Sequence, residues 1–193
     1  GISHTQYEIS VIADITPLSI LWAGVAGIIF GLTAKLFSKS THFWGKTFKT
    51  YISYPPLRPV IGGLVIALAI FAMDSTKYIG LGIPTIVDSF EHNVNFYDFL
   101  LKIAFTSFTL GAGFKGGEVT PLFFICATLG NALIWFIPLP MGLLAGMGFV
   151  AVFAGATNTP IACTIMGIEL FGIESGIFIA IACSIAYLFS GHT

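Results

Sequence analysis

The chain alternates between apolar blocks and short polar breaks, and the blocks are too unequal in length to form a uniform bundle. They cover residues 17–36, 60–73, 96–111, 121–137, 141–156, 160–171 and 173–190. A helix that crosses a hydrocarbon core of about 30 Å perpendicularly needs about 20 residues, and several blocks are shorter than that. Irregular backbone at membrane depth is tolerated only where protein or water surrounds it. Some helices are therefore predicted to end inside the membrane, as the broken helices of many ion transporters do.

The composition places these blocks in a lipid bilayer. Only 9% of the residues are charged, 56% are hydrophobic, and the mean hydropathy is +0.94, whereas an ordinary soluble domain carries roughly 25% charged residues. The net charge of −1 provides no basic field for nucleic acid. Cys126, Cys163 and Cys183 lie in apolar runs without a CxxC spacing, so we interpret them as small hydrophobes. The sequence predicts an all-α integral membrane protein without a metal site or a cofactor.

The first two polar breaks differ in charge. The first contains cations and no acid: Lys35, Lys39, Lys46, Lys49 and Arg58. The second, residues 74–98, contains acids and one lysine: Asp74, Lys77, Asp88, Glu91 and Asp98. Because cytoplasmic loops of membrane proteins carry an excess of Lys and Arg, the first break is predicted to be a cytoplasmic loop and the second a loop on the opposite face. We interpret most of these charges as solvated residues that fix the orientation.

A polar run at residues 111–121 separates two of the apolar blocks. Its sequence, GAGFKGGEVTP, holds several glycines, a carboxylate and a threonine. Glycines let the backbone turn and expose its N–H groups, and Pro121 suits the first turn of a helix. A helix N-terminus presents unsatisfied N–H donors and the positive end of the helix dipole, so it attracts a dehydrated anion. Glu118 fits such a site if it takes up a proton, since an ionised carboxylate would repel the anion.

The stretch from Phe114 to Leu133 resembles the CLC chloride channel and transporter family at the motif usually written GxFxP, and it is most similar to the fluoride-transporting branch. In the chloride branch, an apolar residue and an aromatic follow the first glycine, and a small residue precedes the proline. Glu118, Val119 and Thr120 occupy those places in this chain. This substitution pattern is the signature of the fluoride branch.

The resemblance continues toward the C-terminus. Residues 147–156, 159–162 and 168–170 are similar to the next two helices of the family, in which a glycine-rich segment precedes a helix that starts at a proline and bears a glutamate. The resemblance implies the second of two inverted repeats of the CLC fold, with several short, tilted or broken helices. Residues 1–193 are therefore expected to form a single membrane domain, the C-terminal half of a two-repeat transporter without its last helix.

The function that the resemblance implies is exchange of fluoride against protons in the cell (plasma or inner) membrane, by a multi-pass protein that is not an enzyme. The positions that match the anion-binding motif of the family are Gly117, Glu118, Val119 and Thr120, so the resemblance implies that this segment binds the anion. The backbone N–H groups of Glu118 and Val119 face it, the Glu118 side chain couples it to protons, and the Thr120 hydroxyl helps to select fluoride. Lys115 is a candidate for drawing anions into a vestibule.

The implied partners are fluoride or chloride, protons, the lipid bilayer, the N-terminal half of the same polypeptide, and a second copy that packs through helices in residues 160–190. One alternative is a chloride/proton exchanger or a chloride channel of the same family. A further alternative is a structural or dimerising membrane subunit without transport. An intramembrane enzyme is disfavoured, because no GxSxG or HExxH pattern occurs and Ser190 and His192 do not share a helix face.

Two other polar features receive structural interpretations. Asn158 and Thr159, which precede Pro160, are interpreted as an N-cap. Glu169 lies inside an apolar run, so it is expected to be a buried acid that forms structural hydrogen bonds.

Overall fold

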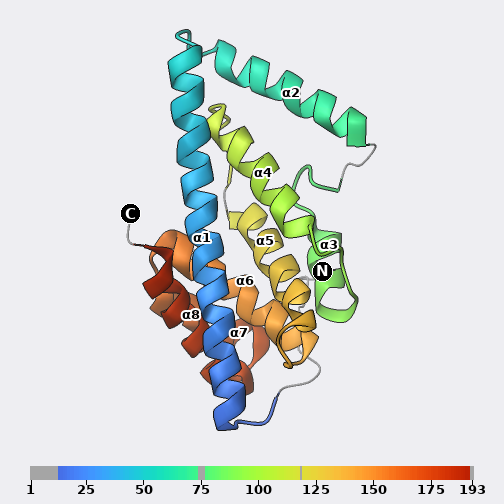
Figure 1. Cartoon of the computed structure of the whole chain (residues 1–193), viewed down its shortest axis with the longest axis vertical. Coiled ribbons are helices and arrows are strands. Elements are labelled where there is room, and N and C mark those ends of the chain that lie inside the picture. Colours follow the sequence, from blue (N-terminus) through green and yellow to red (C-terminus); the bar gives the residue numbers. More distant parts are fainter. Residues whose placement is uncertain (1–12, 74–76, 118, 192–193) are drawn as a thin grey trace, which may run out of the picture.

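The computed structural model describes residues 13–73, 77–117 and 119–191, and these residues contain helices and no strands (Figure 1). The helices are α1 (Pro17–Tyr51), α2 (Leu57–Met73), α3 (Ile83–Glu91), α4 (Asp98–Gly111), α5 (Val119–Ala132), α6 (Met141–Thr157), α7 (Pro160–Phe171) and α8 (Gly176–Ser190). Short 3-10 turns cover Leu133–Trp135 and Ile173–Ser175. The prediction of an all-α fold is confirmed.

The lengths of these helices fall into two groups. α1 and the segment Ile173–Ser190 are long and apolar enough to cross a membrane, whereas α2, α6 and α7 are apolar but have 17 residues or fewer. α5 has 14 residues, followed by one 3-10 turn. The prediction of several short helices is therefore confirmed.

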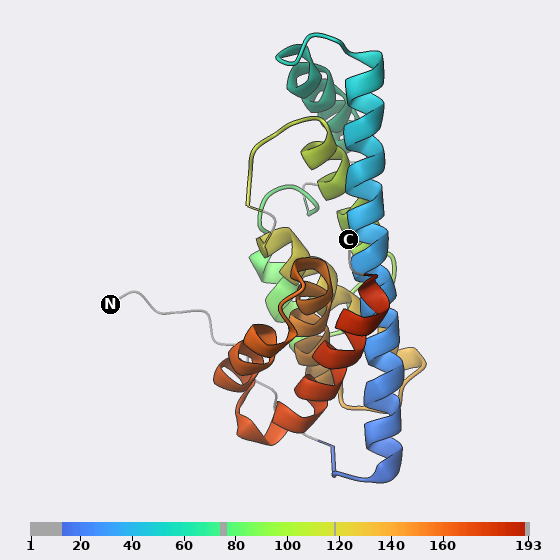
Figure 2. The same cartoon turned by 90° about the vertical axis from the view of Figure 1, so that its left-hand side faces the viewer.

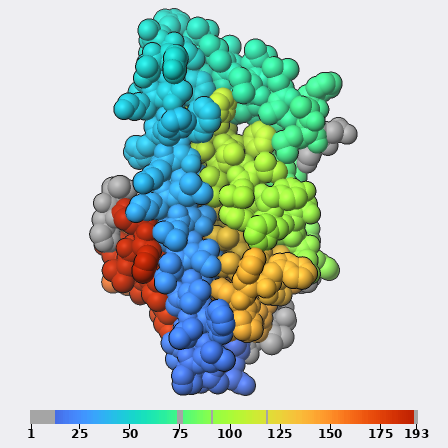
Figure 3. All heavy atoms as spheres, viewed as in Figure 1, coloured from blue at the N-terminus to red at the C-terminus, as the bar shows by residue number. Residues whose placement is uncertain are grey.

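α1 is the longest of the described helices, and it packs mainly against α8, α4 and α6. It has 35 residues, which corresponds to about 52 Å at a rise of 1.5 Å per residue. In the space-filling view it forms a continuous blue-to-cyan ridge, with α8 on one side and α4 on the other (Figure 3). A Cβ atom at Gly31 would lie 2.5 Å from the carbonyl oxygen of Ala186. Glycine at this position therefore lets α1 and α8 pack closely.

The predicted end of the first helix near Leu36 is wrong, because α1 continues to Tyr51. Lys35, Lys39, Lys46 and Lys49 therefore lie on a helix rather than in a loop. Threonine hydroxyls in this part donate to carbonyl oxygens one turn earlier, at 2.8–3.0 Å for Thr41, Thr47 and Thr50. These bonds satisfy the polar side chains without interrupting the helix. The buried Phe37 and Phe48 fix the inner face of the extension.

α6 packs against both α5 and α8. Nearly every residue of α6 is buried, and glycines bring the backbones of α5 and α6 together. A Cβ atom at Gly130 would collide with the carbonyl oxygen of Leu144, and one at Gly148 with the carbonyl oxygen of Cys126. Cys126 and the other two cysteines are buried in this core, which agrees with their interpretation as small hydrophobes.

We expect Gly130→Ala to destabilise the protein by about 1–3 kcal/mol, because the added methyl must push two packed helices apart. Gly45→Ala, in the interior of α1 two turns before its end, is the control, since a Cβ atom there meets nothing within 4 Å. It should be neutral or stabilising by about 0.5–1 kcal/mol. The measurement is thermal unfolding of the purified full-length protein in detergent. Equal stability of the two variants would contradict the tight packing of α5 on α6.

The acidic break is not a simple loop. It contains α3, which begins after Gly82, where φ is +68°, and carries Pro84 in its first turn. The amide group of Asn131 on α5 holds the end of α3, donating to the carbonyl oxygens of Ser89 and His92 at 2.8 and 2.7 Å. It also accepts from the N–H group of Val94 at 3.1 Å.

Asp98 also departs from the prediction, because its side chain is fully buried. It forms an ion pair with Lys77 and accepts a hydrogen bond from the Tyr78 hydroxyl at 2.7 Å. The interpretation of these charges as solvated loop residues is therefore wrong for Asp98. This pairing joins the segment before α3 to the first residue of α4.

Candidate anion site at the start of α5

A short extended segment connects α4 to α5. The N–H groups of Ala112 and Gly113 donate to the carbonyl oxygens of Phe108 and Leu110, at 2.9 and 3.0 Å, and Gly113 has a φ of +95°. Residues 114–117 form no helix, and α5 begins at Val119, as Figure 2 shows. Pro121 lies in the first turn of α5, as predicted. The glycine-rich run therefore ends at the N-terminus of a helix.

The space beside this segment is open. Gly116 and Gly117 are exposed, and a Cβ atom at either position would meet nothing within 4 Å. Packing therefore gives no reason for glycine at these two positions. Val119 is 44% exposed and Thr120 is half-buried. Glu118 lies outside the described residues, so its predicted role stays a prediction.

A cavity of about 300 Å³ adjoins the first turn of α5. Its walls come from three helices: Val119 and Leu122 of α5; Phe37, Ser38, Thr41 and His42 of α1; Phe153, Ala156 and Thr157 of α6. Aliphatic and aromatic groups thus alternate with hydroxyls around the helix terminus. In the described part of the chain, no group of three or more His, Cys, Asp or Glu side chains could hold a metal ion.

A second cavity, of about 400 Å³, extends from Pro121 to a buried lysine that sequence reasoning missed. Lys102 is 1% exposed and lines this cavity. Its ammonium group donates to the carbonyl oxygens of Tyr78 and Gly80, at 3.0 and 2.7 Å, and lies 4.8 Å from the ring centroid of Phe124. Among the described residues, no carboxylate oxygen lies within 4 Å of it. The ammonium group is therefore stabilised by the two carbonyl dipoles and by the face of the Phe124 ring.

The signal for Lys102 was present in the sequence, as a lone cation within the apolar block 96–111. An ionisable residue in a membrane segment is a candidate for a functional site. Lys115, the cation that was predicted to attract anions, is exposed on the segment before α5. Its role remains a prediction.

The two structural interpretations near α7 need correction. Thr159 occupies the N-cap position of α7, but its hydroxyl lies 2.6 Å from the Thr157 hydroxyl and makes no capping bond. Asn158 is instead the C-cap of α6, with a φ of +58°. Glu169 is exposed on α7, so the expectation that it is buried in this chain is wrong.

The family of the chain follows from sequence comparison. A family model described as voltage gated chloride channel matches residues 2–191. This chain belongs to that family. The resemblance predicted from the GxFxP-like run is thus confirmed over nearly the whole sequence.

Within this family, the chain is similar to two individual relatives and to one solved structure. A protein of Pseudomonas syringae pv. tomato named chloride/fluoride channel protein is 53% identical over 199 residues, which cover 100% of this chain and 44% of that protein. An uncharacterized protein of Methanocaldococcus jannaschii is 29% identical over 136 residues, which cover 68% of this chain and 34% of that protein.

A crystal structure of a CLC-type fluoride/proton antiporter superposes with a TM-score of 0.93 at 35% identity, over 98% of this chain and 48% of that one. The fold is therefore that of part of a CLC-type membrane protein. The chain spans about half the length of the curated relatives and of the structure that it matches.

Proposed function

We propose that the full-length protein exchanges fluoride for protons across the cell membrane, and that this chain is its C-terminal half and contributes the anion site. Support comes from two relatives, a chloride/fluoride channel protein and a fluoride/proton antiporter, at 53% and 35% identity. The observation that carries the proposal for this chain is the open, glycine-lined N-terminus of α5, with Glu118 immediately before it.

In the proposed mechanism, fluoride loses its water in front of α5. The N–H groups of Glu118 and Val119 donate to it, and the positive end of the helix dipole attracts it. Fluoride is compact and accepts strong hydrogen bonds, so a protonated Glu118 carboxyl and the Thr120 hydroxyl favour it over chloride. An ionised Glu118 would repel the anion, so the proton and the anion favour each other's binding.

Lys102 provides a second source of positive potential in this mechanism. Its cavity extends to Pro121, two residues after the proposed donor Val119. A buried charge is screened less by salt than an exposed one. We expect the ammonium group to raise the affinity of the α5 terminus for anions without a direct contact.

The partners proposed for the full-length protein are its N-terminal half and a second copy. The outer faces of α7 and α8 and the turn between them support a homodimer through residues 160–190, because large apolar side chains there are exposed in the single chain. These are Ile161, Ile165, Leu170, Ile173, Ile177, Leu188 and Phe189. A lipid-facing surface has the same composition, so we expect the size of the detergent-solubilised protein to distinguish the two.

The test is ion efflux from proteoliposomes that contain the full-length protein, with fluoride compared with chloride, with and without an imposed pH difference. The proposal expects a pH difference to drive fluoride uphill. A chloride/proton exchanger would move chloride uphill, a channel would move anions downhill only, and a structural subunit would move neither.

Gly117→Ala is expected to leave the fold intact but to lower fluoride exchange by on the order of tenfold. A Cβ atom at Gly117 meets nothing within 4 Å, so folding should tolerate it, whereas a methyl beside the helix terminus occupies space that the anion needs. A loss of about 1.4 kcal/mol of anion stabilisation corresponds to that factor. Exchange rates equal to those of the wild type would contradict the placement of the anion beside Gly117.

A further inference from the structure

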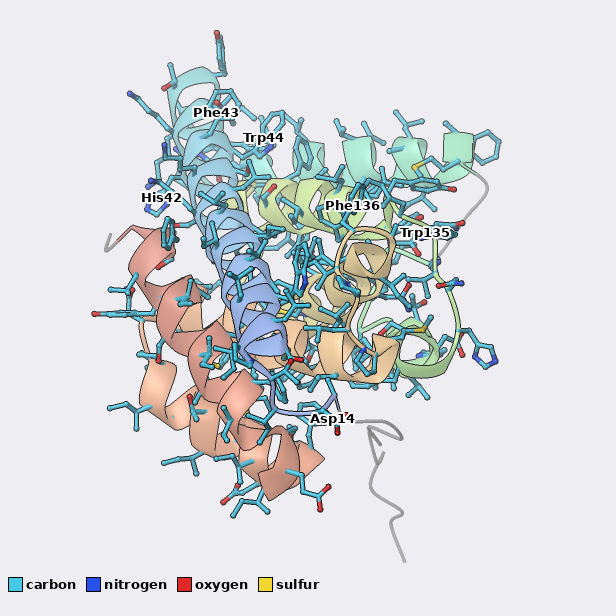
Figure 4. The ribbon with its side chains drawn as sticks, turned by 60° about the horizontal axis from the view of Figure 1, so that its bottom comes forward. Asp14, His42, Phe43, Trp44, Trp135 and Phe136 are labelled. Atoms are coloured by element: carbon cyan, nitrogen blue, oxygen red, sulfur yellow. The ribbon has the colours of Figure 1, made fainter. Side chains whose placement is uncertain are left out.

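The second half of α1 carries a stripe of basic side chains. With 100° per residue, Lys35, Lys39, His42, Lys46 and Lys49 fall within about 80° of one another around the helix axis and extend about 21 Å along it. We call these residues the basic stripe. All of them are exposed except Lys35, which is half-buried. His42 and Trp44 project from opposite sides of α1 (Figure 4), and Trp44 packs on Phe108 of α4. The basic stripe therefore faces away from α4.

Three cavities lie along this face of α1, and all three include His42 in their walls. The first, of about 560 Å³, lies between the basic stripe and the end of α8. The second is the cavity of about 300 Å³ that contains Val119. The third, of about 560 Å³, lies between α1 and the start of the glycine-rich segment, at Gly111 and Gly113. The basic stripe is therefore adjacent both to the segment before α5 and to the cavity at its first turn.

Lysines line two of these three cavities. Lys46 lines the first and the third cavity, and Lys49 and Arg58 line the third, while none of the Asp and Glu residues that the structure describes lines any of the three. In the sequence, no acidic residue occurs between Asp14 and Asp74. The backbones also touch here, since a Cβ atom at Gly111 would lie 2.9 Å from the nitrogen of Gly45.

We propose that the basic stripe of α1 forms an anion-collecting vestibule on the cytoplasmic side, which concentrates halide ions in front of the α5 site. This proposal rests on the proposed function, and it assigns to these lysines a role beyond fixing the orientation. A cleft lined by charges of one sign raises the local concentration of a counter-ion and its on-rate by about 10- to 1000-fold. Because most of the stripe is exposed, the effect must decline steeply with ionic strength, as the Debye length is about 30 Å at 0.01 M salt and 3 Å at 1 M.

The experiment compares the full-length wild type with the double variant Lys39→Gln/Lys46→Gln in proteoliposomes. Initial rates of fluoride exchange are measured over a range of fluoride concentrations, at low salt and at about 0.5 M potassium gluconate. At low salt, the apparent KM of the variant should rise on the order of tenfold with the maximal rate unchanged. At high salt, the difference should fall below about twofold, because the charges are screened.

Two controls separate charge from structure. Lys39→Arg/Lys46→Arg keeps both charges and should retain the wild-type KM and its salt dependence. Glu174→Gln changes an exposed charge in the turn before α8 and should have no effect. If the wild type exchanges fluoride but the glutamine variant shows the same KM at low salt, the vestibule is wrong while the proposed function stands. A wild type that moves no fluoride overturns both.

Discussion

The full-length protein with Glu118→Gln is expected to retain anion binding and to lose proton coupling. Glutamine keeps the size and a hydrogen-bond donor of a protonated carboxyl, but it cannot release a proton. Binding at one of two linked sites typically changes the affinity at the other by about 5- to 150-fold. In the variant, protons and fluoride should no longer change each other's affinity. The measurement is fluoride accumulation in proteoliposomes driven by an imposed pH difference, with proton flux recorded in the same vesicles.

The matched control for this variant is Thr120→Val, which removes a proposed fluoride ligand but leaves Glu118 intact. It should weaken selection of fluoride over chloride while exchange remains coupled to protons. A Glu118→Gln protein that still drives fluoride uphill with a proton gradient would show that another group carries the proton.

Asp98→Ala should produce the largest loss of stability among the described residues that we consider. Its carboxylate is fully buried and bonds to both Lys77 and the Tyr78 hydroxyl. Removal of one partner of a buried ion pair costs about 3–5 kcal/mol, because the charge that remains loses the compensation that this partner gave. The lower value is expected, since the Lys77 side chain is 29% exposed and water compensates in part. Thermal unfolding of the full-length protein in detergent measures the change.

Asp88→Asn is the control for this prediction, since Asp88 is an exposed acid on α3 in the same polar segment. It should change stability by about 0.5 kcal/mol or less, as substitutions at exposed sites usually do. Equal unfolding temperatures for the two variants would mean that the Asp98 pairing adds nothing to stability.

The parts of the fold that the sequence predicted well carry strong local signals. The block 160–171 matches α7 at both ends, because Pro160 suits the first helical position and Gly172, with a φ of +89°, ends the helix. The start of α5 was predicted near Pro121 for the same reason. In both places the boundary depends on residues adjacent in the sequence, which sequence reasoning can evaluate.

The errors arose where distant residues decide the structure. The lysines after Leu36 were interpreted as loop residues from their charge, yet contacts such as the one between Trp44 and Phe108 hold that segment as a helix. Asp98 is buried because Lys77, 21 residues earlier, pairs with it. Lys102 depends likewise on the carbonyl oxygens of Tyr78 and Gly80. The charge pattern of the sequence alone does not show which of these residues will contact one another in the fold.

The candidate site was predicted as a motif, but its surroundings were not. Residues 111–121 identified a helix N-terminus between apolar blocks, and α5 begins there. The contribution of α1 to that site could not be predicted, because it depends on how a long helix packs beside the glycine-rich segment. His42, which lines three cavities, gave no sequence signal beyond a single histidine among lysines.

Proton uptake on fluoride binding tests the central claim most directly. Fluoride is added to the purified full-length protein in weakly buffered detergent solution, and the pH change is compared with that of the Glu118→Gln variant under the same conditions. Because binding of a proton and of fluoride must favour each other reciprocally, the wild type should take up protons as fluoride binds, and the variant should not. Fluoride binding to the wild type without proton uptake, or equal uptake by the variant, would contradict a proton-linked anion site at the start of α5.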